Sequence, residues 1–80
     1  MAEEKFILKG EFIKLDALLK AAGIAPTGGA AKEMIQEGRI LVNGAKETRR
    51  GAKIRGGSKV EAEGSGRAIL VEPDPALKEG

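Results

Sequence analysis

The chain has 80 residues, and its 14 lysines and arginines against 12 acidic residues give a formal net charge of +2. It contains no cysteine and no histidine, which excludes disulfides, the usual zinc sites and catalysis by a thiol or an imidazole. This length makes one small domain with a thin core and no room for a cofactor-sized pocket, so we expect no cofactor, no metal and no small-molecule substrate.

The first predicted element lies in the segment 6–13, FILKGEFI, which favours a short strand followed by a turn. Both aromatic residues, Phe6 and Phe12, fall in this segment, and we expect both to lie in the core. The residues before it are acidic where a secretory signal needs cations, and no apolar run approaches the length of a membrane span. We therefore expect a soluble cytoplasmic protein.

Two helices are predicted next. The first starts at Lys14, because Leu15, Leu18, Leu19 and Ala22 recur at helical spacing on one stripe. A glycine at position 23 then stands where a left-handed cap ends a helix.

The second helix is predicted to open at Thr27, a good N-cap, and to close at Gly38 after about ten residues. Its apolar side consists of Ala31, Met34 and Ile35. The four-residue connection 23–26 is short, so the two helices must pack as neighbours.

Strands are predicted after Gly38, where the apolar period changes to two. Ile40 and Val42 alternate with their neighbours, and Asn43-Gly44 is a strong signal for a tight hairpin turn. Glycine-rich turns at 56–58 and 64–66 separate the further strand candidates 53–55, 59–62 and 68–72, and the tail 73–80 is expected to fray. The fold class is therefore α+β, a helical hairpin packed on a small, twisted, mostly antiparallel sheet in a single domain, 1–80.

One core should join both helices to this sheet. Its predicted members are Leu15, Leu18, Leu19, Ile24, Met34, Ile35, Ile40, Val42, Ile54, Val60, Ile69 and Val71.

Charge is concentrated in the segment 39–59, which carries seven basic side chains against one acid, Glu47. The rest of the chain is mildly acidic. Such a cluster on a small domain is typical of a site for a polyanion, most often a nucleic acid. Period-two alternation further predicts that Lys53 and Arg55 share the outer face of their strand, with Ile54 directed into the core.

An ordered set of motifs runs along the chain: Lys14-Leu15-Asp16, Thr27, Ala31-Lys32, Ile35, Gly38, the segment from Ile40 to Gly44, Gly57 and Val60. This set resembles a known module, the RNA-binding domain named after small-subunit ribosomal protein S-four, also called the alpha-L RNA-binding motif. The resemblance covers about residues 14–62 and is strongest to small stand-alone bacterial members. Two positions depart from the family pattern: Gly28 stands where many members have Arg, and Ser58 where many have Asp.

The resemblance and the charge pattern together imply an RNA-binding surface. Two glycines behind Thr27 would let a phosphate approach the exposed amides of the second helix, although a plain capped turn explains them equally well. Asn43 is explained by turn geometry alone, and Glu47 can orient Arg49 or Arg50. The predicted RNA-binding residues are Lys14, Thr27, Gly28, Gly29, Lys32, Arg39, Asn43, Lys46, Arg49, Arg50, Lys53 and Arg55.

The expected function is therefore non-catalytic binding of structured RNA, with ribosomal RNA as a candidate, by a monomer. The chain has no Tyr or Trp for stacking on splayed bases, and no nucleophile has a base beside it. Two alternatives stay open: a DNA-binding regulator resembling a winged helix, and a protein-interaction module that docks on an acidic partner.

Overall fold

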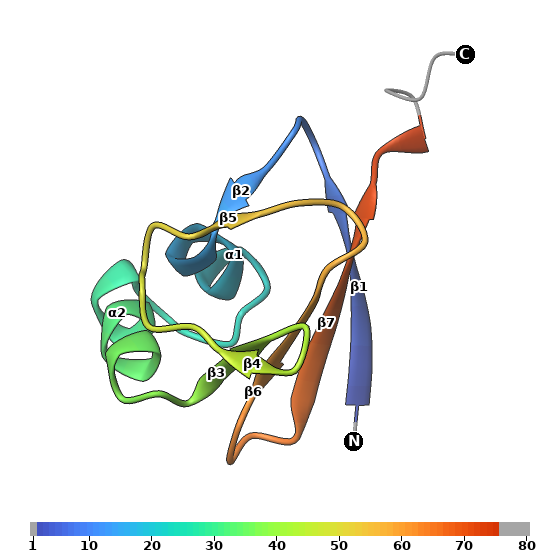
Figure 1. Cartoon of the computed structure of the whole chain (residues 1–80). Helices are drawn as coiled ribbons and strands as arrows, with labels where there is room; N and C mark the ends of the chain where they lie inside the picture. The colour runs from blue at the N-terminus through green and yellow to red at the C-terminus, as the bar shows by residue number, and fades with distance from the viewer. Residues whose placement is uncertain (1, 76–80) are drawn as a thin grey trace.

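The structure is a computed structural model that describes residues 2–75. In this range the chain forms two helices and seven strands (Figure 1). They are β1 (Ala2–Leu8), β2 (Ile13–Lys14), α1 (Leu15–Ala21), α2 (Gly28–Gln36), β3 (Ile40–Val42), β4 (Ala45–Lys46), β5 (Lys53–Ile54), β6 (Lys59–Ala62) and β7 (Arg67–Pro73).

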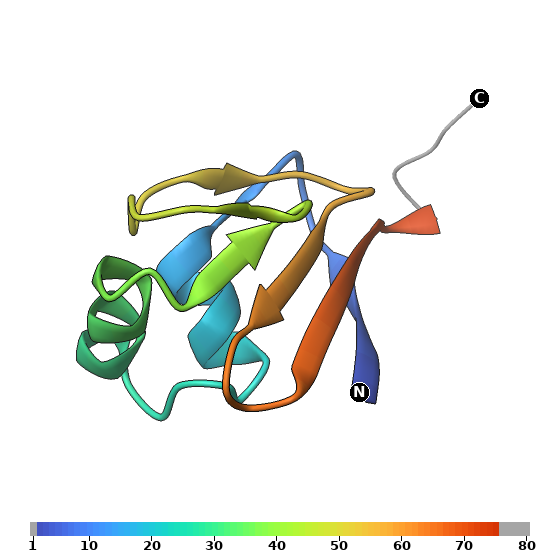
Figure 2. The same cartoon turned by 60° about the horizontal axis from the view of Figure 1, so that its bottom comes forward.

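The strands form two sheets. Five strands pair in the order β1-β7-β6-β3-β4, and β2 pairs with β5 in a separate two-stranded ribbon. The pairing of β1 with β7 is parallel and the others are antiparallel. Both helices lie on the same side of the larger sheet, and the views in Figures 1 and 2 agree on this arrangement. The predicted α+β fold class is confirmed.

The helices begin and end where the sequence signals placed them. The Oγ1 of Thr27 accepts a hydrogen bond from the amide of Ala30 at 3.0 Å and so caps α2. Lys14 precedes α1 without any side-chain cap. Instead, the first amides of α1, those of Leu15 and Asp16, donate to the carbonyls of Ala52 and Arg50 at 2.9 and 3.1 Å. The start of α1 is therefore anchored on the segment before β5.

The core lies between the helices and the sheet. Nine of the twelve predicted core residues are buried, whereas Ile24, Met34 and Val42 are half-buried and pack against its edge. The list of predicted core residues omitted Leu8 and four buried alanines, Ala25, Ala31, Ala62 and Ala68.

The prediction that both phenylalanines lie in the core was wrong for one of them. Phe6 on β1 is half-buried against the core, but Phe12 keeps an exposed fraction of 37%. Gly10, with φ +127°, turns the chain between them. After that turn Ile13 packs on the core, and its neighbour Phe12 remains outside.

The bounds of the strands differ most from the predicted bounds in the first and the last strand. β1 starts at Ala2 rather than near residue 6, because it runs beside the whole of β7 in parallel register. Pro73 ends β7, and the amide of Asp74 donates to the carbonyl of Leu8 at 3.2 Å. The remainder of the predicted frayed tail, 76–80, lies outside the described residues.

Arg67 ties three elements together at one end of the sheet. Its Nε and Nη2 donate to the two carboxylate oxygens of Glu4 on β1 at 2.7 and 2.8 Å. Its Nη1 and Nη2 also donate to the carbonyls of Gly23 and Ala22, at 3.0 and 2.9 Å, just after α1. This guanidinium thus satisfies carbonyls that the end of a helix leaves without partners. Sequence reasoning did not identify this contact.

These hydrogen bonds make stability depend on pH. The hydrogen bonds from Arg67 hold the pKa of Glu4 below its ordinary value. The stabilisation is therefore fully present above the usual glutamate pKa of about 4.3, and it is lost as the pH falls through the lower pKa of the folded state. We expect the melting temperature to fall between about pH 5 and pH 3. The Glu4→Gln variant should melt lower at neutral pH and show a shallower fall.

The control for this experiment is Glu61→Gln, because Glu61 makes no ion pair within the described residues. Its acid profile should run parallel to that of the original protein. An equally steep fall in Glu4→Gln would show that Glu4 contributes nothing to the acid sensitivity.

Candidate functional site

The ribbon of β2 and β5 separates apolar from cationic side chains. Ile13 is the cross-strand partner of Ile54, and these two side chains contribute to the core. Lys14 is the direct partner of Lys53, and both are exposed on the other face. Arg55 follows on that face, as the alternation predicted. We call Lys14, Lys53 and Arg55 the ribbon cations.

The ribbon cations are not neutralised by acids. Like charges on directly opposite strand positions destabilise a sheet, so the Lys14–Lys53 pair does not help the isolated domain to fold. Across residues 2–75, most basic side chains have a carboxylate within 4 Å. Those in this range without one are Lys14, Lys20, Lys32, Lys46, Lys53 and Arg55.

Arg49 and Arg50 lie just before β5 and each has an acidic partner. Arg50 Nε donates to Asp16 Oδ2 at 2.9 Å, which holds this arginine beside the start of α1. Asp16 lies two positions after Lys14 in the sequence. Arg49 Nε donates to Glu47 Oε2 at 3.0 Å, and this bond lowers the pKa of Glu47. The expectation that Glu47 orients one of these arginines is thus met by Arg49. Both guanidinium groups remain substantially exposed.

The start of α2 is sterically open. Gly28 would accept a Cβ with no atom within 4 Å, and a Cβ on Gly29 would meet only Thr27 Oγ1 at 3.9 Å. Neither glycine has a positive φ, so backbone geometry does not require glycine at either position. Lys32 is exposed one turn further along α2. This arrangement is compatible with both earlier interpretations, a phosphate contact and a simple capped turn.

Three other predicted site residues belong to the larger sheet or to the turns beside it and not to the ribbon. Arg39 pairs with Glu37 at 3.3 Å and stands near the turn between β6 and β7, at the far end of the sheet. Lys46 Nζ lies beside Gly38, 3.9 Å from the position that a Cβ on this glycine would take. Gly38 directly follows the C-terminal end of α2, where the helix dipole is negative. Asn43, with φ +52°, accepts a hydrogen bond from the amide of Lys59 at 2.9 Å. The structural explanation of Asn43 therefore suffices.

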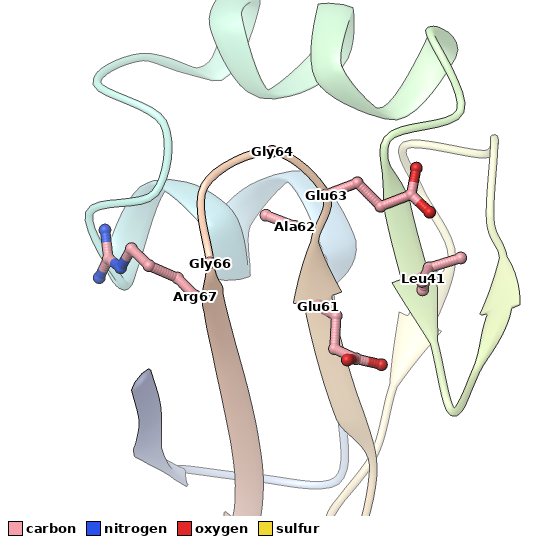
Figure 3. A pocket seen from close by; sticks show the side chains of 7 residues that line it. All are labelled: Leu41, Glu61, Ala62, Glu63, Gly64, Gly66 and Arg67. Atoms are coloured by element: carbon pink, nitrogen blue, oxygen red, sulfur yellow. The ribbon is translucent and has the colours of Figure 1, made fainter. Parts of the chain in front are cut away.

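A hollow of about 290 Å³ opens at the far end of the sheet, beside the β6–β7 turn (Figure 3). It carries the carboxylates of Glu61 and Glu63, and the guanidinium at its rim, that of Arg67, is already bound to Glu4. A hollow with this charge does not suit an anion. It lies apart from the ribbon cations.

Sequence reasoning missed Phe12 as a member of this surface. Lys53 Nζ lies 4.9 Å from the centroid of its ring, and Arg55 Cζ lies 5.8 Å from it. The period-two alternation that placed Lys53 and Arg55 on one face could have found it, because counting back from the exposed Lys14 puts Phe12 on the same face.

Between residues 2 and 75, no helix is long and apolar enough to cross a membrane. Within the same range, no three carboxylate side chains gather closely enough to hold a metal ion.

Comparisons with known proteins find a family, a relative and a solved structure that this chain resembles. The sequence model of the S4 domain family matches residues 6–71. A Bacillus subtilis (strain 168) protein named "Probable ribosome maturation protein RlbA" is 43% identical over 61 residues, which cover 76% of this chain and 86% of that protein. The solution structure of YbcJ from E. coli, described as revealing an alfaL motif involved in RNA-binding, superposes with a TM-score of 0.61. It is 36% identical, and the match covers 88% of this chain and 87% of that one.

Proposed function

Since the chain belongs to the S4 domain family, as the resemblance of its motifs implied, we propose that it binds structured RNA through the outer face of the β2–β5 ribbon. The binding is non-catalytic: the chain recognises a folded RNA and performs no reaction on it. Ribosomal RNA is the first RNA to test, because the Bacillus subtilis relative is named as a probable ribosome maturation protein.

The observation that carries this proposal is the direct pairing of Lys14 with Lys53, beside Arg55 and without carboxylate partners. Cations held close together on a rigid ribbon repel one another until an anion neutralises them. A phosphate backbone supplies several anions at regular spacing, and each contact releases condensed counterions. Arg50, held by Asp16 at 2.9 Å, adds a further exposed cation at the start of α1, the helix that directly follows Lys14.

The ribbon cations are suited to contact phosphates, and this favours one class of RNA. Recognition by phosphate contacts suits double-helical or folded RNA, whose shape and 2′-hydroxyls distinguish it from B-form DNA. The DNA-binding alternative is weakened by the fold, in which the described chain has two helices, and α2 carries Lys32 beside the acidic Glu33.

A competition experiment tests this proposal. A labelled RNA hairpin bound to the protein is displaced at one fixed salt concentration by unlabelled hairpin, by duplex DNA of the same length, or by heparin. We expect the RNA hairpin to displace the label at a lower concentration than either competitor. Stronger competition by DNA would favour the regulator alternative. Absence of binding to any of the three polyanions would leave the acidic-protein alternative.

A further inference from the structure

Phe12 is an aromatic side chain that the fold leaves outside its core. Its exposed fraction is 37%, whereas the adjacent Ile13 packs on the core. Its ring lies against Lys53 and Arg55, with Lys53 Nζ at 4.9 Å and Arg55 Cζ at 5.8 Å from the ring centroid. The ring therefore stands at the edge of the surface formed by the ribbon cations.

Neither the ring nor its neighbours are placed where they best stabilise the isolated domain. Exposing a phenyl ring forgoes the stabilisation that burial gives, and the direct pairing of Lys14 with Lys53 adds repulsion. A ligand that brings a flat π face and a negative charge would satisfy both features at once. A nucleotide with an unpaired base has this combination, since its base stacks on aromatic rings while its phosphate contacts cations.

We propose that Phe12 is the stacking site for one unpaired base of the bound RNA, and that Lys53 and Arg55 hold the phosphates beside that base. This inference rests on the proposed function and specifies it further. The RNA is then a structured RNA with a bulged or looped-out nucleotide next to its helix. The earlier expectation that the chain offers no aromatic stacking was founded on a buried Phe12, and the exposure of this ring removes that ground.

The first test uses two RNA hairpins with the same stem, one fully paired and one with a single bulged adenine. Stacking contributes enough that Phe12→Ala and Phe12→Leu should each weaken binding to the bulged hairpin by about 5- to 160-fold. Binding to the paired hairpin should change by less than about twofold, because it offers no base to the ring. Because the side chain is partly exposed and lies outside the core, both variants should remain folded, which a thermal melt of each variant checks.

The second test uses fluorescence. The chain has no Trp and no Tyr, so Phe12→Trp introduces a single indole whose emission reports on its surroundings. The bulged hairpin should quench this emission and the paired hairpin should not. The control is Ala21→Trp, at the exposed end of α1, where the following carbonyl of Ala22 is bound by Arg67. Its emission should respond to neither hairpin.

The outcomes separate this inference from the function on which it rests. Equal binding of the bulged hairpin by the Phe12 variants, with no quenching, would overturn the stacking site while RNA binding stands. Failure of the original protein to bind either hairpin would overturn the proposed function and this inference with it. Quenching by polyglutamate but by neither RNA would assign the ring to a protein partner.

Discussion

Replacing Lys14 and Lys53 together by alanine is expected to weaken binding to an RNA hairpin by about 25- to 60-fold at 0.1 M salt. Each phosphate contact contributes about 0.7 to 0.9 to the slope of log affinity against log salt. The original protein, with roughly four to six contacts, should show a slope of about −3 to −5, and the double variant, which loses two contacts, should lose about 1.4 to 1.8 units of it. The affinity difference should vanish near 1 M salt.

The matched control is the double variant Lys5→Ala with Lys20→Ala, which lowers the net charge by the same amount. Lys5 lies on β1 beside Glu72, and Lys20 lies near the end of α1. Neither belongs to the ribbon, so the salt slope of the control should stay close to that of the original protein. An unchanged slope in the Lys14/Lys53 variant would show that the ribbon does not contact phosphates.

Leu19→Ala is expected to lower the free energy of unfolding by about 2–5 kcal/mol, the usual cost of truncating a buried leucine. Leu19 is completely buried in the core between α1 and the sheet. Its carbonyl also accepts hydrogen bonds from the amides of Ile24 and Ala25, at 3.0 and 3.1 Å, in the connection that leads to α2. Because the connection to α2 is anchored on Leu19, a cavity that lets α1 shift at this position should also loosen the packing of α2. Urea denaturation followed by circular dichroism measures the change.

The control for this substitution is Lys20→Ala, at the next position of the same helix. Lys20 is exposed, so its replacement should change the free energy of unfolding by no more than about 0.5 kcal/mol. A loss well below 1 kcal/mol in Leu19→Ala would mean that α1 does not pack on the sheet as the structure describes.

The helices and the hairpin could be predicted from sequence because local chemistry determines them. Thr27 caps α2, Gly23 ends the stretch after α1 with φ +76°, and Asn43-Gly44 forms the tight turn, with φ values of +52° and +87°. The inward position of Ile54, and hence the outward position of Lys53, followed from period-two alternation.

Features that depend on contacts distant in sequence could not be predicted in the same way. The parallel pairing of β1 with β7 joins the two ends of the described chain, and no local pattern specifies it. The link from Arg67 to Glu4 spans 63 positions. The direct pairing of Lys14 with Lys53, on which the functional proposal depends, required the register of β2 against β5.

In the candidate site, too, local features could be predicted and features that depend on distant contacts could not. Basic residues could be identified from charge density, but their grouping could not. Arg39 lies near the β6–β7 turn, away from the ribbon, and Arg49 is bound by Glu47.

Gly56 lets the chain pass close to the end of β7 just after β5. A Cβ at this position would stand 2.9 Å from Pro73 Cδ, so a larger residue would force the chain to shift.

The most direct test of RNA binding by the ribbon is a nuclear magnetic resonance titration of the isotopically labelled protein with an RNA hairpin, followed through its backbone amides. We expect the largest shifts at Lys14, Lys53 and Arg55, with little change in the β6–β7 turn at 64–66. Shifts concentrated in that turn and around Arg39, with the ribbon unaffected, would contradict the account and place the interface at the other end of the sheet.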